Sequence, residues 1–380
     1  MTRPEPKGWC PGAHRPMLSG DGLLVRVRPR LARLTSDQMR GLAEAARRWG
    51  SGLIEVTNRA NLQLRGVKPA FAEPLLKGLA ALDLLDVEAS TEARRNILTA
   101  PDWQTGDATE RLAVGLAARL GDLPPLPAKF GFAIDAGPSA VLQDAPADIR
   151  IERGQSGGLI LRADGHGFGT PILETDAVDR LLALARWFAQ HAGPDLRRMA
   201  QMADKALRWP EWYRPTEAPL RSLELMRPGL TATGACIGLP FGQIPVDVLL
   251  DLPATAVRIT PWRLLILEGL RRMPDLPGLL TRADDHLLAV DACPGAPFCA
   301  AATVRTRSLA RALVPLLAAG QSLHVSGCAK GCARARPADL TLVGRDGRFD
   351  IVQTGAAWDT PRQSGLRPGD LAGAIHALQL

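Results

Sequence analysis

Several features that would assign the 380-residue sequence to a common class of protein are missing. No run of about 18 consecutive apolar residues occurs, so we expect no membrane-spanning segment. The stretch MTRPEPKGWCPGAHRP contains no apolar core of the kind that marks a secretory signal, which favours the cytoplasm. The net charge is +7, yet no long basic run interleaved with aromatic residues is present. Nucleic acid is therefore not expected as a partner, which leaves a small polyanion or a merely arginine-rich surface.

Cysteine is scarce and unevenly placed. Four of the six cysteines form two pairs, Cys293 with Cys299 and Cys328 with Cys332. In a reducing compartment such pairs are typical of metal or redox sites rather than disulfides. The C-x5-C spacing fits zinc poorly, whereas four thiolates suit a [4Fe–4S] cluster, and the small residues around them let backbone N–H groups approach the sulfurs. Structural zinc and buried inert cysteines remain alternatives.

The other two cysteines stand apart from these pairs. Cys10 and Cys236 are each expected to be buried small residues, and Cys10 is also a minor metal-ligand candidate because His14 follows four residues later. Two histidines and a carboxylate would suit an iron that activates O2. The sequence does not identify such a set, because the candidate histidines are scattered: His14, His166, His286 and His324.

The first part of the chain predicts alternating strands and helices. Leu23–Pro29 alternates apolar and basic residues, which predicts a strand with one arginine-bearing face. Thr35 and Gln38 stand in capping-box spacing at the start of a predicted helix. Residues 53–67 then predict strand, short loop and strand, and residues 73–86 a second helix. This order indicates an α+β unit of ferredoxin-like type.

Further elements follow before the middle of the chain. We expect a helix over 108–120, a β-hairpin over 149–161 and an amphipathic helix over 176–190. The glycine-rich stretch 165–170 precedes no phosphate-binding helix and is expected to be a hairpin turn, so no nicotinamide-binding fold is evident. Residues 208–221 are rich in proline and tryptophan and predict a linker.

After this stretch the first unit returns. Ile54–Gly66 aligns without gaps on Val257–Gly269, and a helix-like segment precedes both copies. Four positions of this alignment are identical: Thr57 with Thr260, Leu62 with Leu265, Leu64 with Leu267, and Gly66 with Gly269. The match predicts an internal duplication, and two such units would form a groove for a large flat ligand.

The cysteine pattern and the duplicated TNRANLQLRG string together resemble the sirohaem-dependent nitrite/sulfite reductase superfamily. The resemblance implies an α+β fold of duplicated ferredoxin-like half-domains plus α/β domains of nitrite/sulfite reductase type. The expected boundaries are 18–90 for the first half-domain, 91–207 for the first α/β tetrapyrrole-binding domain, 208–221 for the linker, 222–275 for the second half-domain, and 276–380 for the second α/β domain with the cluster.

The resemblance also implies roles for individual residues. In those reductases a tetrapyrrole lies between the two halves, and basic side chains hold its carboxylates. The positions that match are Arg26, Arg59, Arg95 and Lys129. The cysteines that match as ligands of a [4Fe–4S] cluster are Cys293, Cys299, Cys328 and Cys332, the last at the position that bridges to the haem iron.

Two positions depart from the reductases. Gly131 stands where the sulfite-reducing members have a second lysine, and Trp262 stands opposite Arg59 in the second half. Together with the strings GLPFGQIPVDVLL, VRITPWR and WCPG, these departures make the chain resemble a branch of the superfamily whose members hydroxylate a precorrin. That branch implies an O2-dependent monooxygenase that acts on C20 of precorrin-3A, with γ-lactone formation, in aerobic cobalamin biosynthesis.

In that branch the tetrapyrrole is substrate rather than cofactor. The resemblance implies a [4Fe–4S] cluster, admits a mononuclear non-haem iron, and requires an external NAD(P)H-dependent electron donor. The alternative is a sirohaem-dependent assimilatory sulfite or nitrite reductase. A third class is a non-catalytic iron–sulfur or tetrapyrrole-carrier protein.

Overall fold

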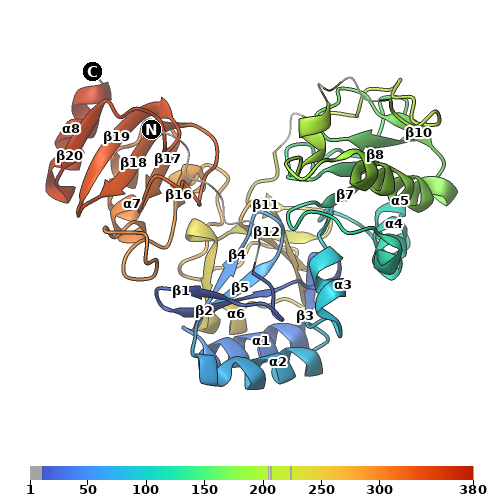
Figure 1. Ribbon diagram of the computed structural model, residues 1–380. Helices are drawn as coiled ribbons and strands as arrows, with labels where there is room; N and C mark the ends of the chain where they lie inside the picture. Colours follow the sequence, from blue (N-terminus) through green and yellow to red (C-terminus); the bar gives the residue numbers. More distant parts are fainter. Residues whose placement is uncertain (1–10, 204, 206–207, 223–224, 380) are drawn as a thin grey trace.

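The computed structural model describes residues 11–203, 205, 208–222 and 225–379. Two ferredoxin-like units form the base of the molecule, and two α/β units stand above them on opposite sides (Figure 1). In the described part of the chain, none of the helices is both long and apolar enough to span a membrane.

The first ferredoxin-like unit begins with a hairpin and a capped helix. Its elements are β1 (Met17–Ser19), β2 (Gly22–Val27), β3 (Arg33–Thr35), α1 (Ser36–Trp49), β4 (Leu53–Val56), β5 (Leu62–Val67) and α2 (Ala72–Ala81). The Thr35 hydroxyl accepts a hydrogen bond from the Gln38 N–H at 3.2 Å, and the Gln38 side chain accepts one from the Thr35 N–H at 3.1 Å. The predicted capping box is thus confirmed. This cap fixes the start of α1, and Leu42 and Ala43 of the helix lie in a hydrophobic core that both ferredoxin-like units share.

The second ferredoxin-like unit exchanges a strand with the first. Its elements are β11 (Gly229–Leu230), β12 (Gly234–Gly238), β13 (Gln243–Pro245), α6 (Val246–Leu250), β14 (Ala256–Ile259) and β15 (Leu264–Glu268). Strand β3 of the first unit pairs with β14, and β13 of the second unit pairs with β4. The sheet orders are therefore β1-β2-β5-β4-β13 and β11-β12-β15-β14-β3. This reciprocal exchange joins the two units.

The predicted duplication is confirmed in the details of the backbone. The Thr57 hydroxyl accepts hydrogen bonds from the N–H groups two and four residues later, at 3.3 and 3.2 Å. The Thr260 hydroxyl makes the same two bonds, at 3.3 and 3.2 Å. The third residue after each threonine is left-handed, with φ of 51° at Ala60 and 60° at Arg263. Both units therefore present the same tight loop between their last two strands.

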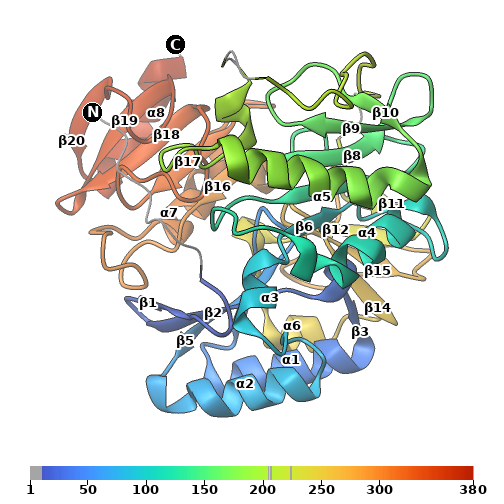
Figure 2. The same cartoon turned by 45° about the vertical axis from the view of Figure 1, so that its right-hand side comes forward.

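The two α/β units also repeat each other. The first contains α3 (Ala89–Arg94), β6 (Ile97–Thr99), α4 (Ala108–Ala118), β7 (Phe132–Asp135), β8 (Ile149–Arg153), β9 (Leu159–Ala163), β10 (Thr170–Ile172) and α5 (Glu174–His191). The second contains β16 (Val290–Ala292), α7 (Arg307–Leu313), β17 (Leu323–Ser326), β18 (Ala338–Arg345), β19 (Arg348–Gly355), β20 (Gln363–Leu366) and α8 (Leu371–Gln379). In each sheet the first three strands pair in parallel, and each of the last two strands pairs antiparallel with the strand before it. Figure 2 shows α4 and α5 side by side on the first of these sheets.

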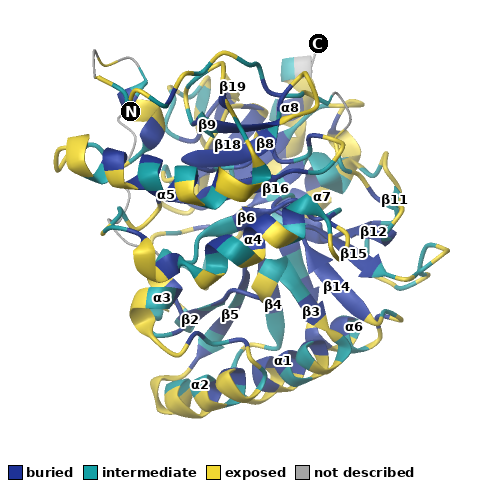
Figure 3. Cartoon of the chain, turned by 90° about the vertical axis from the view of Figure 1, so that its right-hand side faces the viewer, coloured by how far each residue is buried: buried dark blue, intermediate teal, exposed yellow. Residues whose placement is uncertain are grey.

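The aromatic segment over 208–221, which is predicted to be a linker, packs against the first α/β unit. The Trp209 ring stacks on Trp187 of α5 at 4.2 Å between centroids. Tyr213 is buried, and its hydroxyl accepts a hydrogen bond from the Ala163 N–H at 2.9 Å. Figure 3 shows the alternation of buried and exposed residues along α5. Burial of large aromatic rings against a helix is favourable and holds this segment in place. The proline content of the segment does not indicate this packing.

Candidate functional site: paired cysteine loops on an arginine-bearing sheet

The two cysteine pairs start at the carboxyl ends of adjacent parallel strands. Cys293 directly follows β16, Cys328 lies two residues beyond β17, and these strands pair in parallel. Cys293 is 7% exposed, and its sulfur accepts a hydrogen bond from the Gly327 N–H at 3.1 Å. Parallel strands bring their carboxyl ends to one edge, so loops far apart in sequence meet there.

The four thiols lie within electrostatic range of one another. Burial raises the pKa of the Cys293 thiol, and the charges of Cys328 and Cys299 raise it further. Cys332 is an exposed residue. The pKa of its thiol is nevertheless raised, first by desolvation and then by the charges of the other three cysteines. Thiolate charges repel at short range, so an uncompensated group of four favours the protonated form until a cation binds.

The structure itself shows no metal site at the paired cysteines. In the described ranges, no three His, Cys, Asp or Glu side chains are placed to hold one metal ion. A [4Fe–4S] cube binds each thiolate through a different iron, so its ligands stand further apart than those of one zinc. The backbone N–H that reaches Cys293 also suits such a cluster, whose sulfurs accept hydrogen bonds.

The first cysteine loop is held on the first ferredoxin-like sheet. The Arg65 guanidinium, on β5, donates to the Phe298 carbonyl oxygen at 2.9 Å, and the Ser19 hydroxyl donates to the same oxygen at 2.9 Å. Arg65 is itself fixed by Asp21 through two bonds of 3.0 Å. Phe298 immediately precedes Cys299, so this buried ion pair sets the position of a cysteine.

A second buried carboxylate ties the same loop region down. Glu55 of β4 accepts a hydrogen bond of 2.7 Å from Arg307, at the start of α7, and one of 3.2 Å from Gln243. The Glu55 carboxylate also lies 3.8 Å from Arg65. The loop between Cys299 and α7 is therefore anchored at both ends on the first sheet.

The second cysteine loop is held by the other ferredoxin-like unit. Arg263, in the left-handed position of the second tight loop, donates to the Ala333 carbonyl oxygen at 2.9 Å and pairs with Asp291 of β16. Arg334 reaches the same Asp291 at 3.0 Å. Ala333 and Arg334 directly follow Cys332, so one carboxylate and two arginines position this end of the loop.

A buried histidine lies beneath this ion pair. His324 of β17 faces Asp291 across the parallel register and is fully buried. Neither of its ring nitrogens has a hydrogen-bond partner among the residues that the structure describes. Burial lowers its pKa to about 4, a shift that Asp291 opposes and Arg334 and Arg263 increase. The imidazole is therefore neutral at pH 7.

Two of the four predicted basic residues are brought together. The Arg59 guanidinium donates to the Lys129 carbonyl oxygen at 2.9 Å, which joins the first tight loop to the first α/β unit. Arg26 lies opposite Gln63 on the neighbouring strand and donates to its side chain at 3.2 Å. The Arg26 Nε is buried and has no hydrogen-bond partner within the described part of the chain.

Arg95 has a different environment from the other three. Its guanidinium donates to both Asp86 oxygens, at 2.8 to 3.0 Å, and to the Arg28 carbonyl oxygen at 2.8 Å. Only 11% of its side chain is exposed. Arg95 therefore holds this corner of the fold together, and we do not retain it as a direct ligand contact.

Sequence reasoning missed Arg28, which stands beside Arg26 on the same strand face. It is 9% exposed, and burial lowers its pKa to about 10. It donates to the Glu92 carbonyl oxygen, while the Glu92 carboxylate accepts the N–H groups of Ala13 and His14 at 2.6 and 3.1 Å. The alternation in Leu23–Pro29 contained the signal, because it places both arginines on the face opposite the core.

That face connects the basic residues to the cysteine loop. Val25 and Val27 point into the shared core, so Arg26 and Arg28 point the other way. On the next strand Gln63 and Arg65 share that face, and Arg65 reaches the first cysteine loop. One sheet face thus carries side chains suited to an anion and also the anchor of the thiol group.

The remaining sequence candidates lie elsewhere. Cys10 lies outside the described residues. Cys236 is fully buried, and burial raises its pKa to about 12, as expected for an inert cysteine. His14 bonds to the Asp86 carbonyl oxygen at 2.6 Å. The described histidines do not form an iron site with neighbouring cysteines or carboxylates.

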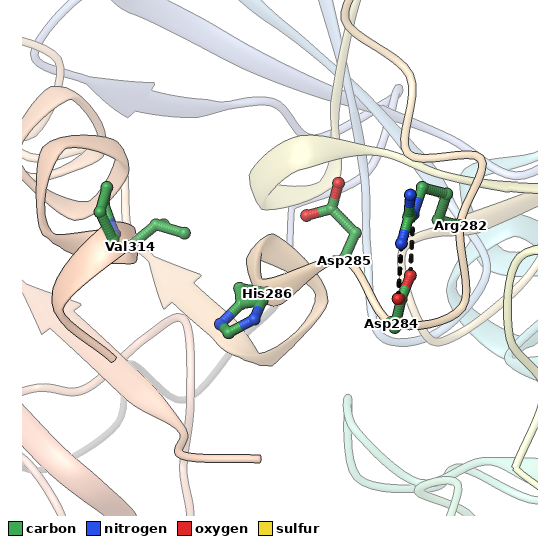
Figure 4. A pocket seen from close by; sticks show the side chains of 6 residues that line it. Arg282, Asp284, Asp285, His286 and Val314 are labelled. Carbon is green, nitrogen blue, oxygen red and sulfur yellow. Dashed lines mark hydrogen bonds and ion pairs between the residues drawn. The ribbon is translucent and has the colours of Figure 1, made fainter. Parts of the chain in front are cut away.

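Two surface hollows lie away from these residues. One, of about 480 Å³, is lined by Arg282, Asp284, Asp285, His286, Val314 and Pro315 (Figure 4). The Arg282 guanidinium in this hollow donates two hydrogen bonds, of 3.0 and 2.7 Å, to the Asp284 carboxylate. The other, of about 340 Å³, lies between residues 125–127 and 188–197. Neither is lined by the paired cysteines or the predicted basic residues, so neither is assigned to this site.

The duplicated, strand-exchanged sheets with cysteine loops anchored on them define a protein of the nitrite/sulfite reductase class. Residues 15–82 match the nitrite/sulfite reductase ferredoxin-like half domain. The solved structure of the Mycobacterium tuberculosis NirA protein shares this fold, with a TM-score of 0.66 and 16% identity over 94% of this chain and 80% of that one.

Sequence relatives refine the assignment. A ferredoxin–nitrite reductase of Synechococcus elongatus is 25% identical over 88% of this chain and 78% of its own. A precorrin-3B synthase of a Sinorhizobium species is 30% identical over 93% of this chain and 84% of its own. The chain belongs to the precorrin-3B synthase family, within the nitrite/sulfite reductase superfamily.

Proposed function

We propose that the chain is an O2-dependent precorrin-3B synthase that hydroxylates C20 of precorrin-3A and closes a γ-lactone, in aerobic cobalamin biosynthesis. One atom of O2 enters the C20 hydroxyl group and the other leaves as water. This balance consumes two electrons and two protons, supplied by an external NAD(P)H-dependent donor. The lactone closes from a substrate carboxyl group and changes no further electrons.

The observation that supports this proposal is the single sheet face that links basic residues to the thiol group. Precorrins carry many carboxylates, and arginine binds carboxylates through two parallel hydrogen bonds. Arg26, whose buried Nε has no partner among the described residues, and Arg59, which contacts the Lys129 carbonyl oxygen, are therefore proposed to bind the tetrapyrrole together with Lys129. Arg65 connects the same face to Cys299 through Phe298.

The four paired cysteines are proposed to hold a [4Fe–4S] cluster. Such a cluster, when bound, supplies one-electron transfer. The chain's own contribution is to fix the loops: Arg65 and Ser19 hold the first, and Arg263 and Arg334 hold the second. Thiolate ligands persist in a reducing compartment, so we propose a cytoplasmic location. A mononuclear non-haem iron remains part of the proposal without assigned ligands.

Sirohaem-dependent reduction of sulfite or nitrite is the alternative function. The 25% identity to ferredoxin–nitrite reductases favours it. In that case the basic residues would hold a resident tetrapyrrole rather than a substrate. Gly131 argues against it, because this position contributes no cation to bind a small anion.

Anaerobic purification followed by chemical analysis tests the proposal. We expect a brown protein with about four sulfides and four irons per chain, without extractable sirohaem, that consumes O2 only when precorrin-3A and an electron donor are present. Release of stoichiometric sirohaem would replace this proposal with the reductase alternative. Precorrin binding without O2 consumption would indicate a carrier.

A further inference from the structure

A short edge segment, residues 11–14, lies beside β2, the strand that carries two arginines on one face. The Arg26 N–H donates to the Gly12 carbonyl oxygen at 3.3 Å, beyond the three residue pairs that join β1 to β2. The first three residues of the edge segment are buried, and Ala13 belongs to the core that both ferredoxin-like units share. The edge segment is therefore packed onto the fold where the arginine-bearing face ends.

One carboxylate holds the edge segment in place. Glu92 of α3 is 5% exposed, and its carboxylate accepts the N–H of Ala13 at 2.6 Å and that of His14 at 3.1 Å. The His14 ring donates to the Asp86 carbonyl oxygen at 2.6 Å, which adds a contact at the end of the segment. Hydrogen bonds from backbone N–H groups to an ionised carboxylate are among the stronger ones in proteins.

Glu92 also holds an arginine, through its backbone. The Arg28 guanidinium donates to the Glu92 carbonyl oxygen, and its Nε is buried with no partner among the described residues. Burial lowers the pKa of Arg28 to about 10, and the nearby Glu92 carboxylate opposes this shift. Glu92 thus connects two parts of this region, because its side chain binds the edge segment and its carbonyl oxygen binds Arg28.

Gly12 allows this contact because it has no side chain. A Cβ atom built on Gly12 would lie 2.6 Å from one Glu92 carboxylate oxygen and 2.9 Å from the other. The φ of Gly12 does not lie in the left-handed region, so space and not backbone conformation requires glycine here. A methyl group at this position would push the carboxylate away, and the two N–H groups would lose their acceptor.

We propose that Glu92 is a positioning residue that holds the edge segment as a barrier beside the arginine-bearing face, and that this barrier sets the rate at which the tetrapyrrole enters and leaves. The inference deepens the proposed function and rests on it. A tetrapyrrole that is a substrate must exchange in every turnover, whereas a resident cofactor stays bound. Opening the edge segment breaks a few hydrogen bonds and leaves the sheet behind it intact, which suits a lid beside an exchanging ligand.

The test measures binding and release of uroporphyrin III, an octacarboxylate porphyrin, by the anaerobically purified holoprotein, with stopped-flow absorbance. We expect Glu92→Ala to accelerate release about tenfold and to accelerate binding as well, so that the dissociation constant changes less than either rate. Gly12→Ala should have the same effect, because its methyl group displaces the Glu92 carboxylate. In the double variant Gly12→Ala should add no further acceleration, since the atoms nearest to its methyl group are then gone.

Two further variants identify the cause. Glu92→Gln keeps an oxygen that accepts the two N–H groups, so it should exchange the porphyrin at nearly the rates of the unaltered protein. Glu217→Ala is the matched control, because the Glu217 carboxylate also accepts a backbone N–H, that of Ser156 at 2.8 Å, and also lies against a glycine, Gly154, but at the loop between β8 and β9. It should leave both rates unchanged. A variant that only loses folded protein lowers the fraction that binds and not the rate constants.

The outcomes separate the inference from the function on which it rests. If the unaltered protein does not bind uroporphyrin III, the proposed function fails and the inference fails with it. If it binds and both Glu92→Ala and Gly12→Ala exchange at unaltered rates, the inference alone is overturned, as it would be by a further acceleration in the double variant. Release by Glu92→Gln as fast as by Glu92→Ala would also overturn it, because the effect would then come from the charge beside Arg28. Should Glu92→Ala fail to fold, Gly12→Ala decides, and unaltered exchange in that variant would overturn the proposal.

Discussion

The Arg65 guanidinium of β5 lies 2.9 Å from the Phe298 carbonyl oxygen, in the residue directly before Cys299, although the two residues are 233 positions apart in the chain. Asp21 neutralises the arginine on its other side, and both side chains of this pair are nearly buried, at 8% and 12% exposure. The relationship makes a strand of the first ferredoxin-like unit responsible for the position of a cysteine in the second α/β unit.

Replacing Arg65 by alanine should therefore affect both stability and metal content. Asp21 would be left as a largely buried carboxylate without its cation, while Glu55 would keep only Arg307, and breaking a buried ion pair costs about 3–5 kcal/mol. Urea unfolding and an iron and sulfide count on the anaerobically purified protein measure the two effects. Arg40→Ala, which removes an exposed pair with Asp37, is the control and should change stability by no more than about 1 kcal/mol. A full iron content in Arg65→Ala would contradict the anchoring role.

The second cysteine loop should depend in the same way on Asp291. Asp291→Asn removes the charge that Arg263 and Arg334 share, so the residues after Cys332 lose their common anchor. We expect a lowered iron and sulfide content and a faster loss of the cluster to a chelator. Asp284→Asn, which removes an exposed pair with Arg282, should leave both values unchanged. Equal chelation rates in the two variants would argue against the anchor.

Cysteine replacement tests the proposed ligands directly. Cys332→Ser should abolish the cluster, because serine supplies no thiolate, and the EPR signal of the reduced cluster should disappear. The same loss is expected for Cys293→Ser. Cys236→Ala is the control, since Cys236 is buried apart from the thiol group and should retain the signal. An intact cluster signal in Cys332→Ser would remove this residue from the ligand set.

The other predicted basic residues should separate into ligand contacts and structural ones. Lys129→Ala and Arg26→Ala are expected to weaken tetrapyrrole binding by about 1–3 kcal/mol, the range for a hydrogen bond to a charged group, with little change in folding stability. Arg95→Ala should instead lower the stability, because it leaves Asp86 buried and unpaired. Titration with uroporphyrin III and urea unfolding distinguish the two effects. Undiminished binding in Lys129→Ala would exclude it from the site.

Stability should also depend on the proton carried by Asp135. Its carboxyl group is 3% exposed, and burial raises its pKa to about 7, an effect that the N–H groups of Leu142 and Val141 oppose and that Asp102 and Glu152 increase. Because the folded-state pKa lies above the unfolded one, Asp135 favours folding most at low pH, and this contribution is lost as the pH rises through 7. Asp135→Asn should therefore gain about 3 kcal/mol relative to the unaltered protein between pH 5 and pH 8.

Unfolding curves at four pH values measure this difference. Asp37→Asn, an exposed carboxylate on α1, provides the comparison. A stability difference between Asp135→Asn and the unaltered protein that stays constant with pH would contradict the assignment.

Local patterns were enough to predict much of the fold. The capping box of α1, the duplication of the tight loops and the helix over 176–190 all follow from spacing within short stretches, and each is present. How residues 208–221 pack could not be predicted, because proline content does not indicate whether Trp209 and Tyr213 contact the first α/β unit. The exchange of β3 and β13 between the two ferredoxin-like sheets could not be predicted either. The local pattern of such a short strand is the same in whichever sheet it pairs.

Short stretches of the chain were enough to identify its candidate functional features: two cysteine pairs, the arginine-bearing strand and the repeated loop. What these residues contact depends on the tertiary structure. In the folded protein Arg95 pairs with Asp86, and Arg59 fills the space beside Gly131. Arg65 and Arg263 donate hydrogen bonds to the two cysteine loops. These contacts join residues that are far apart in the chain. A buried charge requires a partner, but a short stretch of sequence does not specify which residue that partner will be.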